Sequence, residues 1–141
     1  MDITGKRIGL DTNIFIYYFN SSEQFGEQVK NIFKKLIDNK SLAITSIITF
    51  IEILSLGAKD IEIDKLKNIL LQIPNLKICN LNQDIGEKSA KIRRDYGYSI
   101  PDSIQIATAL IQKVDLFITN DNKLLKFKEI PIVSLNQINI I

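Results

Sequence analysis

Apolar residues along this chain fall into short runs separated by longer segments in which they recur at helical spacing. The runs are bounded by turn residues and have the length of buried strands. They cover residues 7–11, 42–45, 76–79, 115–118 and 131–133. Because helical segments separate successive strands, the pattern predicts an α/β fold with a parallel central sheet covered on both faces.

The intervening segments predict helices of ordinary length, followed by a short one that carries Leu124, Leu125 and Phe127. The longer helices are expected over 12–19, 25–37, 47–56, 64–73, 83–96 and 103–113. The helix at 47–56 is apolar nearly all round, so it is predicted to be buried, and Gly57 is expected to end it. Asn82 and Gly97 are expected to cap the two ends of the helix at 83–96.

The composition narrows the class of protein. The 141 residues suit a single domain, residues 1–141, with an ordinary 45% of hydrophobic residues. A net charge of only +2 means that any nucleic acid must be held by local basic patches. The apolar runs are too short or too interrupted for a membrane span, and the N-terminus lacks a secretory pattern, so a cytoplasmic protein without a membrane partner is expected.

The near absence of histidine and cysteine limits the catalytic groups that the chain can use. The chain has no histidine, which excludes Ser-His-Asp and Cys-His catalysis. Its one cysteine, Cys79, forms no internal disulfide and cannot build a zinc cluster, so it is predicted to be a small core residue. Carboxylates are therefore the main candidates for reactive groups.

Four acids stand out by position. Glu52 lies among apolar neighbours on its helix, so it either reaches solvent or a lysine, or points into a polar cleft. Asp11 and Asp121 follow the first and fourth predicted strands. Asp102 opens the helix that leads into the fourth strand. Each aspartate also fits a second interpretation, as a cap or first-turn residue of its helix.

Taken together, these acids predict a cation site. Asp11 and Asp121 lie at the carboxyl edge of the sheet, where α/β proteins place their ligands. Two like charges about 4 Å apart repel by on the order of 4 kcal/mol at an effective dielectric of 20, so a cluster needs cations or raised pKa values. Mg²⁺ or Mn²⁺ prefers such oxygen ligands and activates water for phosphoryl displacement.

The acid pattern resembles the PIN-domain family of metal-dependent ribonucleases, and among them the small toxins of VapC type. The likeness covers nearly the whole chain and rests on four motifs: Leu10-Asp11-Thr12-Asn13, Thr49-Phe50-Ile51-Glu52-Ile53, Pro101 to Ala109, and Phe117-Ile118-Thr119-Asn120-Asp121. It implies a three-layer α/β/α fold around about five parallel strands. Asp11 and Asp102 would be metal ligands, and Glu52 and Asp121 would complete the pocket. Asn13 and Thr119 would orient these acids.

The resemblance also implies a function. The chain is expected to be an endoribonuclease that uses Mg²⁺ or Mn²⁺ and leaves a 3′-hydroxyl and a 5′-phosphate. It is expected to be the toxin of a type II toxin–antitoxin pair, with RNA as substrate, an antitoxin protein as partner and a homodimer as its assembly. Basic residues predicted to steer the RNA are Arg93, Arg94 and Lys123, with Lys88 and Lys91 nearby; a plain solvated helix surface is the alternative for each.

Other functions fit parts of the pattern. A PIN-domain RNA-processing nuclease outside any toxin–antitoxin pair would carry the same acids. A non-catalytic PIN-like module that binds RNA or protein would be expected to lose them. A phosphatase of haloacid-dehalogenase type would need D-x-D after the first strand, whereas this chain has Asp11-Thr12-Asn13.

Overall fold

The computed structural model describes residues 1–56 and 60–139. Its centre is an all-parallel sheet of five strands in the order β3-β2-β1-β4-β5. The strands are β1 (Arg7–Leu10), β2 (Leu42–Ser46), β3 (Leu76–Cys79), β4 (Leu116–Ile118) and β5 (Ile132–Val133). The predicted α/β class and the five predicted strands are confirmed, each end within about one residue, which is the usual uncertainty of such boundaries.

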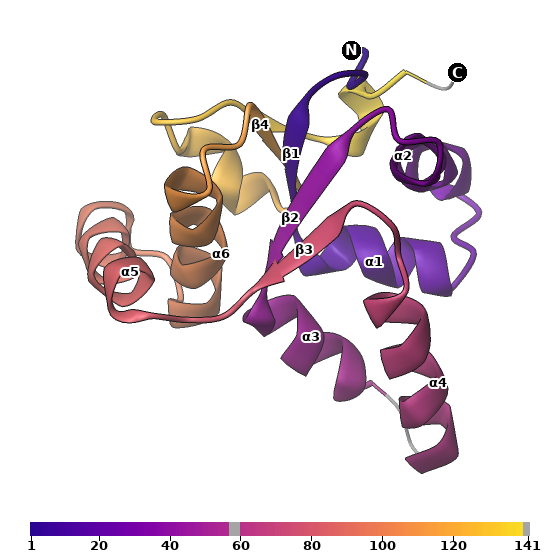
Figure 1. The fold of residues 1–141 in the computed structure, drawn as a ribbon. Helices are drawn as coiled ribbons and strands as arrows, with labels where there is room; N and C mark the ends of the chain where they lie inside the picture. The colour runs from indigo at the N-terminus through magenta and orange to yellow at the C-terminus, as the bar shows by residue number, and fades with distance from the viewer. Residues whose placement is uncertain (57–59, 140–141) are drawn as a thin grey trace.

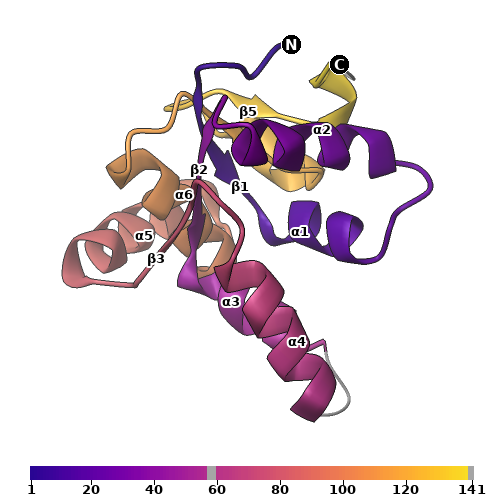
Figure 2. The same cartoon turned by 45° about the vertical axis from the view of Figure 1, so that its right-hand side comes forward.

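Helices enclose the sheet in three layers (Figures 1 and 2). The helices α1 (Thr12–Phe19) and α2 (Gly26–Ile37) cover one face, and α5 (Gln83–Tyr96) and α6 (Ile100–Ile111) lie on the other. The helices α3 (Ile47–Leu54) and α4 (Asp60–Leu71) extend beyond the carboxyl ends of the strands, at the bottom of Figure 1. Two 3-10 helices, η1 (Asn122–Lys126) and η2 (Leu135–Gln137), flank β5.

Two apolar cores lie on opposite faces of the sheet, because successive strand residues point to opposite sides. Ile8, Leu10 and Ile118 join the core beneath α1 and α2, whereas Phe117 joins the core beneath α5 and α6. Gly9 allows the second core to pack closely: a Cβ there would lie 2.7 Å from Cδ2 of Phe117. The missing side chain therefore lets Phe117 pack against β1 beside α6, the helix that carries Asp102.

The prediction that the helix at 47–56 is buried all round is wrong. In α3 only Thr49 and Ile53 are buried, and Ile51 is 54% exposed. The helix projects past the edge of the sheet, so only one side of it meets the core (Figure 1). It ends at Leu54, before Gly57, which lies outside the described residues.

The helix predicted at 64–73 begins earlier, at Asp60, and ends at Leu71. The caps predicted for α5 are confirmed: Asn82 accepts a hydrogen bond from the amide of Ile85, and Gly97 has the left-handed φ of 71°. No helix in residues 1–56 and 60–139 is both long and apolar enough to cross a bilayer.

Candidate active site

The candidate site lies at the point in the sheet where the strand order reverses. The chain passes from β1 to β2 on one side and later returns to β4 on the other, so β1 and β4 are neighbours with Leu10 beside Ile118. Parallel sheets bind ligands at the carboxyl ends of such strands, where the connections diverge. Asp11 directly follows β1, and Thr119 directly follows β4.

Asp11 is held at this point by two hydrogen bonds. Its carboxylate caps α1 by accepting a hydrogen bond from the amide of Thr12 at 2.8 Å. It also accepts one from the hydroxyl of Thr119 at 2.7 Å. Thr119 is fully buried, and its oxygen in turn accepts from the side-chain amide of Asn13 at 3.3 Å and the backbone amide of Asp121 at 3.0 Å. Thr119 and Asn13 thus link the carboxyl ends of β1 and β4.

Asp11 is a buried carboxylate, an environment that disfavours its charged form. It is only 7% exposed, and burial raises its pKa from 3.8 to about 6, against the lowering effect of its two hydrogen bonds. The charges of Asp102 and Glu52 raise that pKa further, so both acids lie within electrostatic reach of Asp11. In the described part of the chain no lysine or arginine forms an ion pair with any of these three acids.

Glu52 is exposed at the surface of α3, so it escapes the desolvation cost that a buried position on that helix would bring. One of its oxygens is nevertheless fixed, because the hydroxyl of Thr12 donates to Oε1 at 2.9 Å. Thr12 follows Asp11 directly. The start of α1 therefore holds two of the predicted acids, one through its own cap and one through the next side chain.

Asp102 and Asp121 approach the site from the α6 side of the sheet. Asp102 is half-buried in the first turn of α6, whose cap is Ser99. Asp121 caps η1 and forms an ion pair with Lys123 at 3.7 Å. Burial raises the pKa of the Tyr98 hydroxyl, and the neighbouring Tyr96 and the charges of both aspartates add to the rise. Asp102 and Asp121 therefore share one neighbourhood.

These oxygen ligands fit a hard divalent cation. Within residues 1–56 and 60–139, no three acidic side chains converge closely enough in this conformation to ligate one ion. Mg²⁺ does not need three acidic ligands from the protein, since it is usually bound by one or two carboxylates and keeps several waters. The raised pKa of Asp11 marks a carboxylate that gains from a cation beside it. The donor set and its charge therefore suit Mg²⁺ or Mn²⁺.

Comparison with known proteins decides the family. The sequence matches the PIN domain family over residues 8–131. The chain belongs to the PIN-domain family. No curated protein matches it.

Several solved structures align with most of the chain. A chain from a toxin–antitoxin complex of Klebsiella pneumoniae aligns with a TM-score of 0.67 and 26% identity, covering 91% of this chain and 97% of that one. VapBC2 from Rickettsia felis, bound to a promoter DNA fragment, aligns with a TM-score of 0.72 and 18% identity over 91% and 98%. VapC20 from Mycobacterium tuberculosis, a toxin that cleaves the sarcin-ricin loop, aligns with a TM-score of 0.62 and 18% identity over 88% and 98%.

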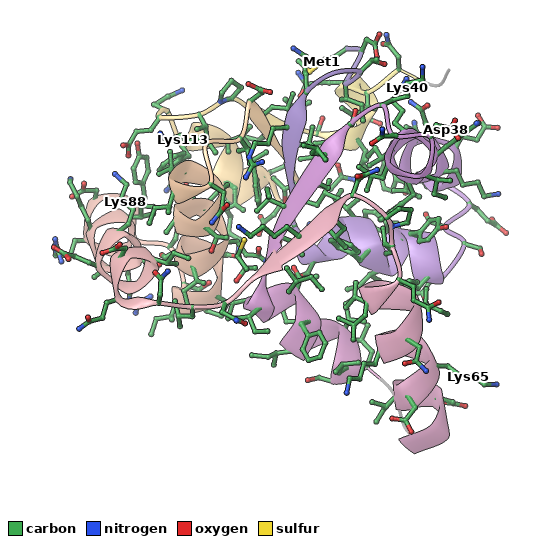
Figure 3. All side chains as sticks on the ribbon, viewed as in Figure 1. Met1, Asp38, Lys40, Lys65, Lys88 and Lys113 are labelled. Carbon is green, nitrogen blue, oxygen red and sulfur yellow. The ribbon has the colours of Figure 1, made fainter. Side chains whose placement is uncertain are left out.

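The basic residues expected to bind RNA are distributed unevenly around this PIN domain. Lys123 lies at the site, paired with Asp121. Arg94 is exposed on α5, and Lys88 on the same helix is half-buried and pairs with Glu129 (Figure 3). Arg93 donates to the carbonyl oxygen of Tyr98 at 2.7 Å.

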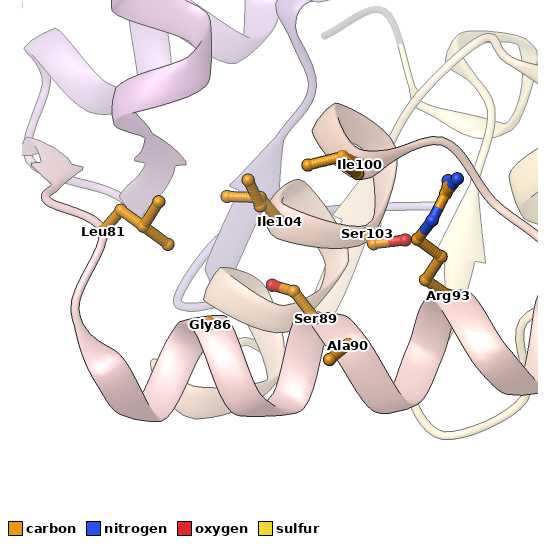
Figure 4. A pocket seen from close by; sticks show the side chains of 8 residues that line it. All are labelled: Leu81, Gly86, Ser89, Ala90, Arg93, Ile100, Ser103 and Ile104. Atoms are coloured by element: carbon orange, nitrogen blue, oxygen red, sulfur yellow. The ribbon is translucent and has the colours of Figure 1, made fainter.

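Arg93 also lines an apolar groove of about 330 Å³ between α5 and α6 (Figure 4). Its other lining residues are Leu81, Gly86, Ser89, Ala90, Ile100, Ser103 and Ile104. None of the four acids is among the described residues that line this groove. It is therefore a feature separate from the carboxyl edge of the sheet.

Sequence reasoning missed a buried polar cluster behind the acids in this PIN domain. Thr12, Thr45, Thr49 and Gln105 are all buried and hydrogen-bonded to one another. The available signal was a polar residue inside an otherwise apolar helix: Thr49 in α3 and Gln105 in α6. Their contacts join α1, β2, α3 and α6 at one point.

The raised pKa of Asp11 predicts that, without metal, the folded chain is more stable at acid pH than at neutral pH. Between pH 3.8 and about 6 the folded state keeps a proton on Asp11 that the unfolded state has lost. The free energy of unfolding should therefore fall with rising pH across that window, by about 3 kcal/mol in total. Urea denaturation in EDTA at several pH values measures this. The fall should be absent from Asp11→Asn, which cannot titrate at this position, so it should remain in the difference between the two proteins. A parallel pH dependence in both proteins would contradict it.

Proposed function

We propose that this PIN domain, residues 1–141, is an endoribonuclease that depends on Mg²⁺ or Mn²⁺. The observation that carries the proposal is Asp11: a buried carboxylate with a pKa of about 6, at the carboxyl edge of the sheet, with Asp102 and Glu52 as its electrostatic neighbours. Structural ion pairs do not explain it, because none within the described residues involves these three acids. A strongly perturbed carboxylate at a ligand-binding edge is typical of a functional site.

The side chains of the site have different roles in the proposed reaction. Asp11 and Asp102 would ligate the cation, with Glu52 and Asp121 contributing directly or through water. Thr119, supported by Asn13, keeps the Asp11 carboxylate turned toward the site. When bound, the ion would lower the pKa of a ligated water and neutralise charge on the scissile phosphate. Hydrolysis would leave a 3′-hydroxyl and a 5′-phosphate on the RNA.

RNA is proposed as the substrate because a chain of the same fold, VapC20, is a toxin that cleaves the sarcin-ricin loop. Lys123 would contact phosphate next to the acids, and it would leave its ion pair with Asp121 to do so. Arg93 and Arg94 on α5 would extend the basic track away from the site. These contacts would position the backbone and are expected to weaken as salt rises.

The proposed biological setting is a type II toxin–antitoxin pair in the cytoplasm. The similar chain from Klebsiella pneumoniae, at 26% identity, was solved in a toxin–antitoxin complex. An antitoxin protein is therefore proposed as the partner, and a homodimer as the assembly. A small protein that is encoded beside the gene and copurifies with this chain would support the pair. An RNA-processing nuclease outside such a pair would share the site but have no such neighbour.

RNA cleavage with and without chelation tests the proposed function. The purified chain is incubated with structured RNA in Mg²⁺ or Mn²⁺, in EDTA, and in EDTA followed by excess Mn²⁺. Cleavage should require the metal, return when it is restored, and yield 5′-phosphate ends. Cleavage that persists in EDTA would refute metal dependence. Absence of any cleavage or Mn²⁺ binding would favour the non-catalytic PIN-like module.

A further inference from the structure

A buried chain of polar side chains runs from α6 to Glu52. Its members are Gln105 on α6, Thr12 at the start of α1, Thr49 on α3 and Thr45 on β2, each 5% exposed or less. Polar groups this deeply buried must satisfy one another, because water does not reach them. Their hydrogen bonds can therefore be followed donor by donor.

The side-chain amide of Gln105 sets the direction of these bonds. Its Nε2 atom lies 3.1 Å from the hydroxyl oxygen of Thr12 and 2.8 Å from that of Thr49. An amide nitrogen carries two protons and accepts none, so both threonine oxygens act as acceptors toward Gln105. Each hydroxyl has a single proton of its own, which must then point elsewhere.

The two free protons have one destination each. Thr12 donates to Oε1 of Glu52 at 2.9 Å. Thr45 donates its single proton to the carbonyl oxygen of Leu10 at 2.8 Å, because a carbonyl can only accept. Thr49 must therefore be the donor in the 2.7 Å hydrogen bond between Thr49 and Thr45. One branch thus ends on a carboxylate of the candidate site and the other on the backbone of β1. The 3.1 Å contact between Thr12 and Thr49 is left as a contact of two acceptors.

We propose that Gln105 is a positioning residue for Glu52: by donating to Thr12 and Thr49 together, its amide holds the Thr12 hydroxyl in the orientation whose proton meets the Glu52 carboxylate, and so keeps that exposed side chain turned toward Asp11. This inference rests on the proposed metal-dependent function. Without the Gln105 protons, Thr12 is free to donate to Thr49 instead, and Glu52 loses the one hydrogen bond that its side chain makes to the described residues.

The orientation of the Gln105 amide can be checked against the rest of the cluster. In this orientation its Oε1 is buried and has no hydrogen-bond partner within residues 1–56 and 60–139, a state that costs stability. Turning the amide over would give that oxygen two hydroxyl protons, but it would take those protons from the Thr12–Glu52 and Thr49–Thr45 hydrogen bonds. The orientation that keeps both bonds is therefore the one in which Gln105 donates to Thr12 and Thr49.

Mn²⁺ titration of three variants tests the inference. Gln105→Met keeps the volume but removes both donors, and Thr12→Val removes the hydroxyl that reaches Glu52. Thr108→Val is the matched control: it lies on the same helix, is equally buried, and loses only a hydroxyl bond to the carbonyl of Ile104. Calorimetry with Mn²⁺ alone gives the affinity, and urea denaturation gives the stability of each variant.

Gln105→Met and Thr12→Val are expected to weaken Mn²⁺ binding by about 10-fold or more, the usual effect of losing a group that orients a ligand. Thr108→Val should lose stability with unchanged affinity, and Thr12→Ser, which keeps the hydroxyl, should restore affinity. Equal affinities in Gln105→Met, Thr108→Val and the wild type would overturn the inference while leaving the proposed function intact. A wild-type chain that binds no Mn²⁺ would instead refute the proposed function. If Gln105→Met fails to fold, equal affinities in Thr12→Val and the wild type would still overturn the inference, because Gln105 is proposed to act on Glu52 only through the Thr12 hydroxyl.

Discussion

Asp11→Asn is expected to abolish RNA cleavage while leaving the fold at pH 7 at least as stable as the wild type. The carboxylate would be a direct metal ligand, so its loss should lower the cleavage rate by more than the about 10- to 100-fold typical of groups that only orient a ligand. Removing the buried charge should stabilise the chain by up to about 3 kcal/mol. Loss of a hydrogen bond from Thr12 or Thr119 offsets about 1 kcal/mol of this gain.

Cleavage assays and urea denaturation at pH 7, on the same preparations, measure both effects. Asp64→Asn serves as the control, since Asp64 is an exposed acid on α4 and should change neither quantity. The opposite signs of the two effects are the informative part, because a merely structural acid would lose stability together with activity. Full cleavage by Asp11→Asn, or an unfolded variant, would contradict this reading of the buried carboxylate.

Asp102→Asn should also abolish cleavage, but with a different signature in stability. Asp102 is half-buried, and its carboxylate makes no hydrogen bond to the described residues. The variant therefore loses only the favourable interaction with the N-terminus of α6, about 0.3–1 kcal/mol. Because the charge of Asp102 raises the pKa of Asp11, its removal should also lower that pKa.

The change in the pKa of Asp11 shows whether Asp102 and Asp11 belong to one site or to two independent sites. In Asp102→Asn the acid-favoured stability window of Asp11 should end at a lower pH than in the wild type, as measured by denaturation in EDTA. The Asp64→Asn control should leave the window in place. A variant that stops cleaving RNA without moving the window would mean that Asp102 acts apart from Asp11.

The sequence predicted the strands well because each is a short apolar run in a fixed alternation with helices. It also placed Asp11, Asp102 and Asp121 at helix starts, where the structure shows that they serve as caps or first-turn acids. A role as a helix cap and a role as a metal ligand are compatible for these aspartates. The turn at the carboxyl end of a parallel strand needs a cap, and the cap side chain then faces the ligand edge.

The exposure of Glu52 and the cluster around Gln105 depend on tertiary contacts, which the periodicity of apolar residues does not reveal. The exposure of Glu52 follows from α3 projecting past the sheet, which an apolar sequence cannot reveal. The cluster around Gln105 joins side chains from distant segments, such as Thr12 and Gln105, through hydrogen bonds. A buried polar residue in an apolar helix signals such a cluster but does not name its partners.

The proposed function depends most on Asp11, Glu52, Asp102 and Asp121 forming one site for a divalent cation. Diffraction from crystals grown with Mn²⁺, read as an anomalous difference map, tests this directly. A peak is expected at the carboxyl ends of β1 and β4, within ligand distance of Asp11 and Asp102, and it should be lost in Asp11→Asn. A Mn²⁺ peak elsewhere on the chain, with ordered carboxylates and no ion between them, would contradict it.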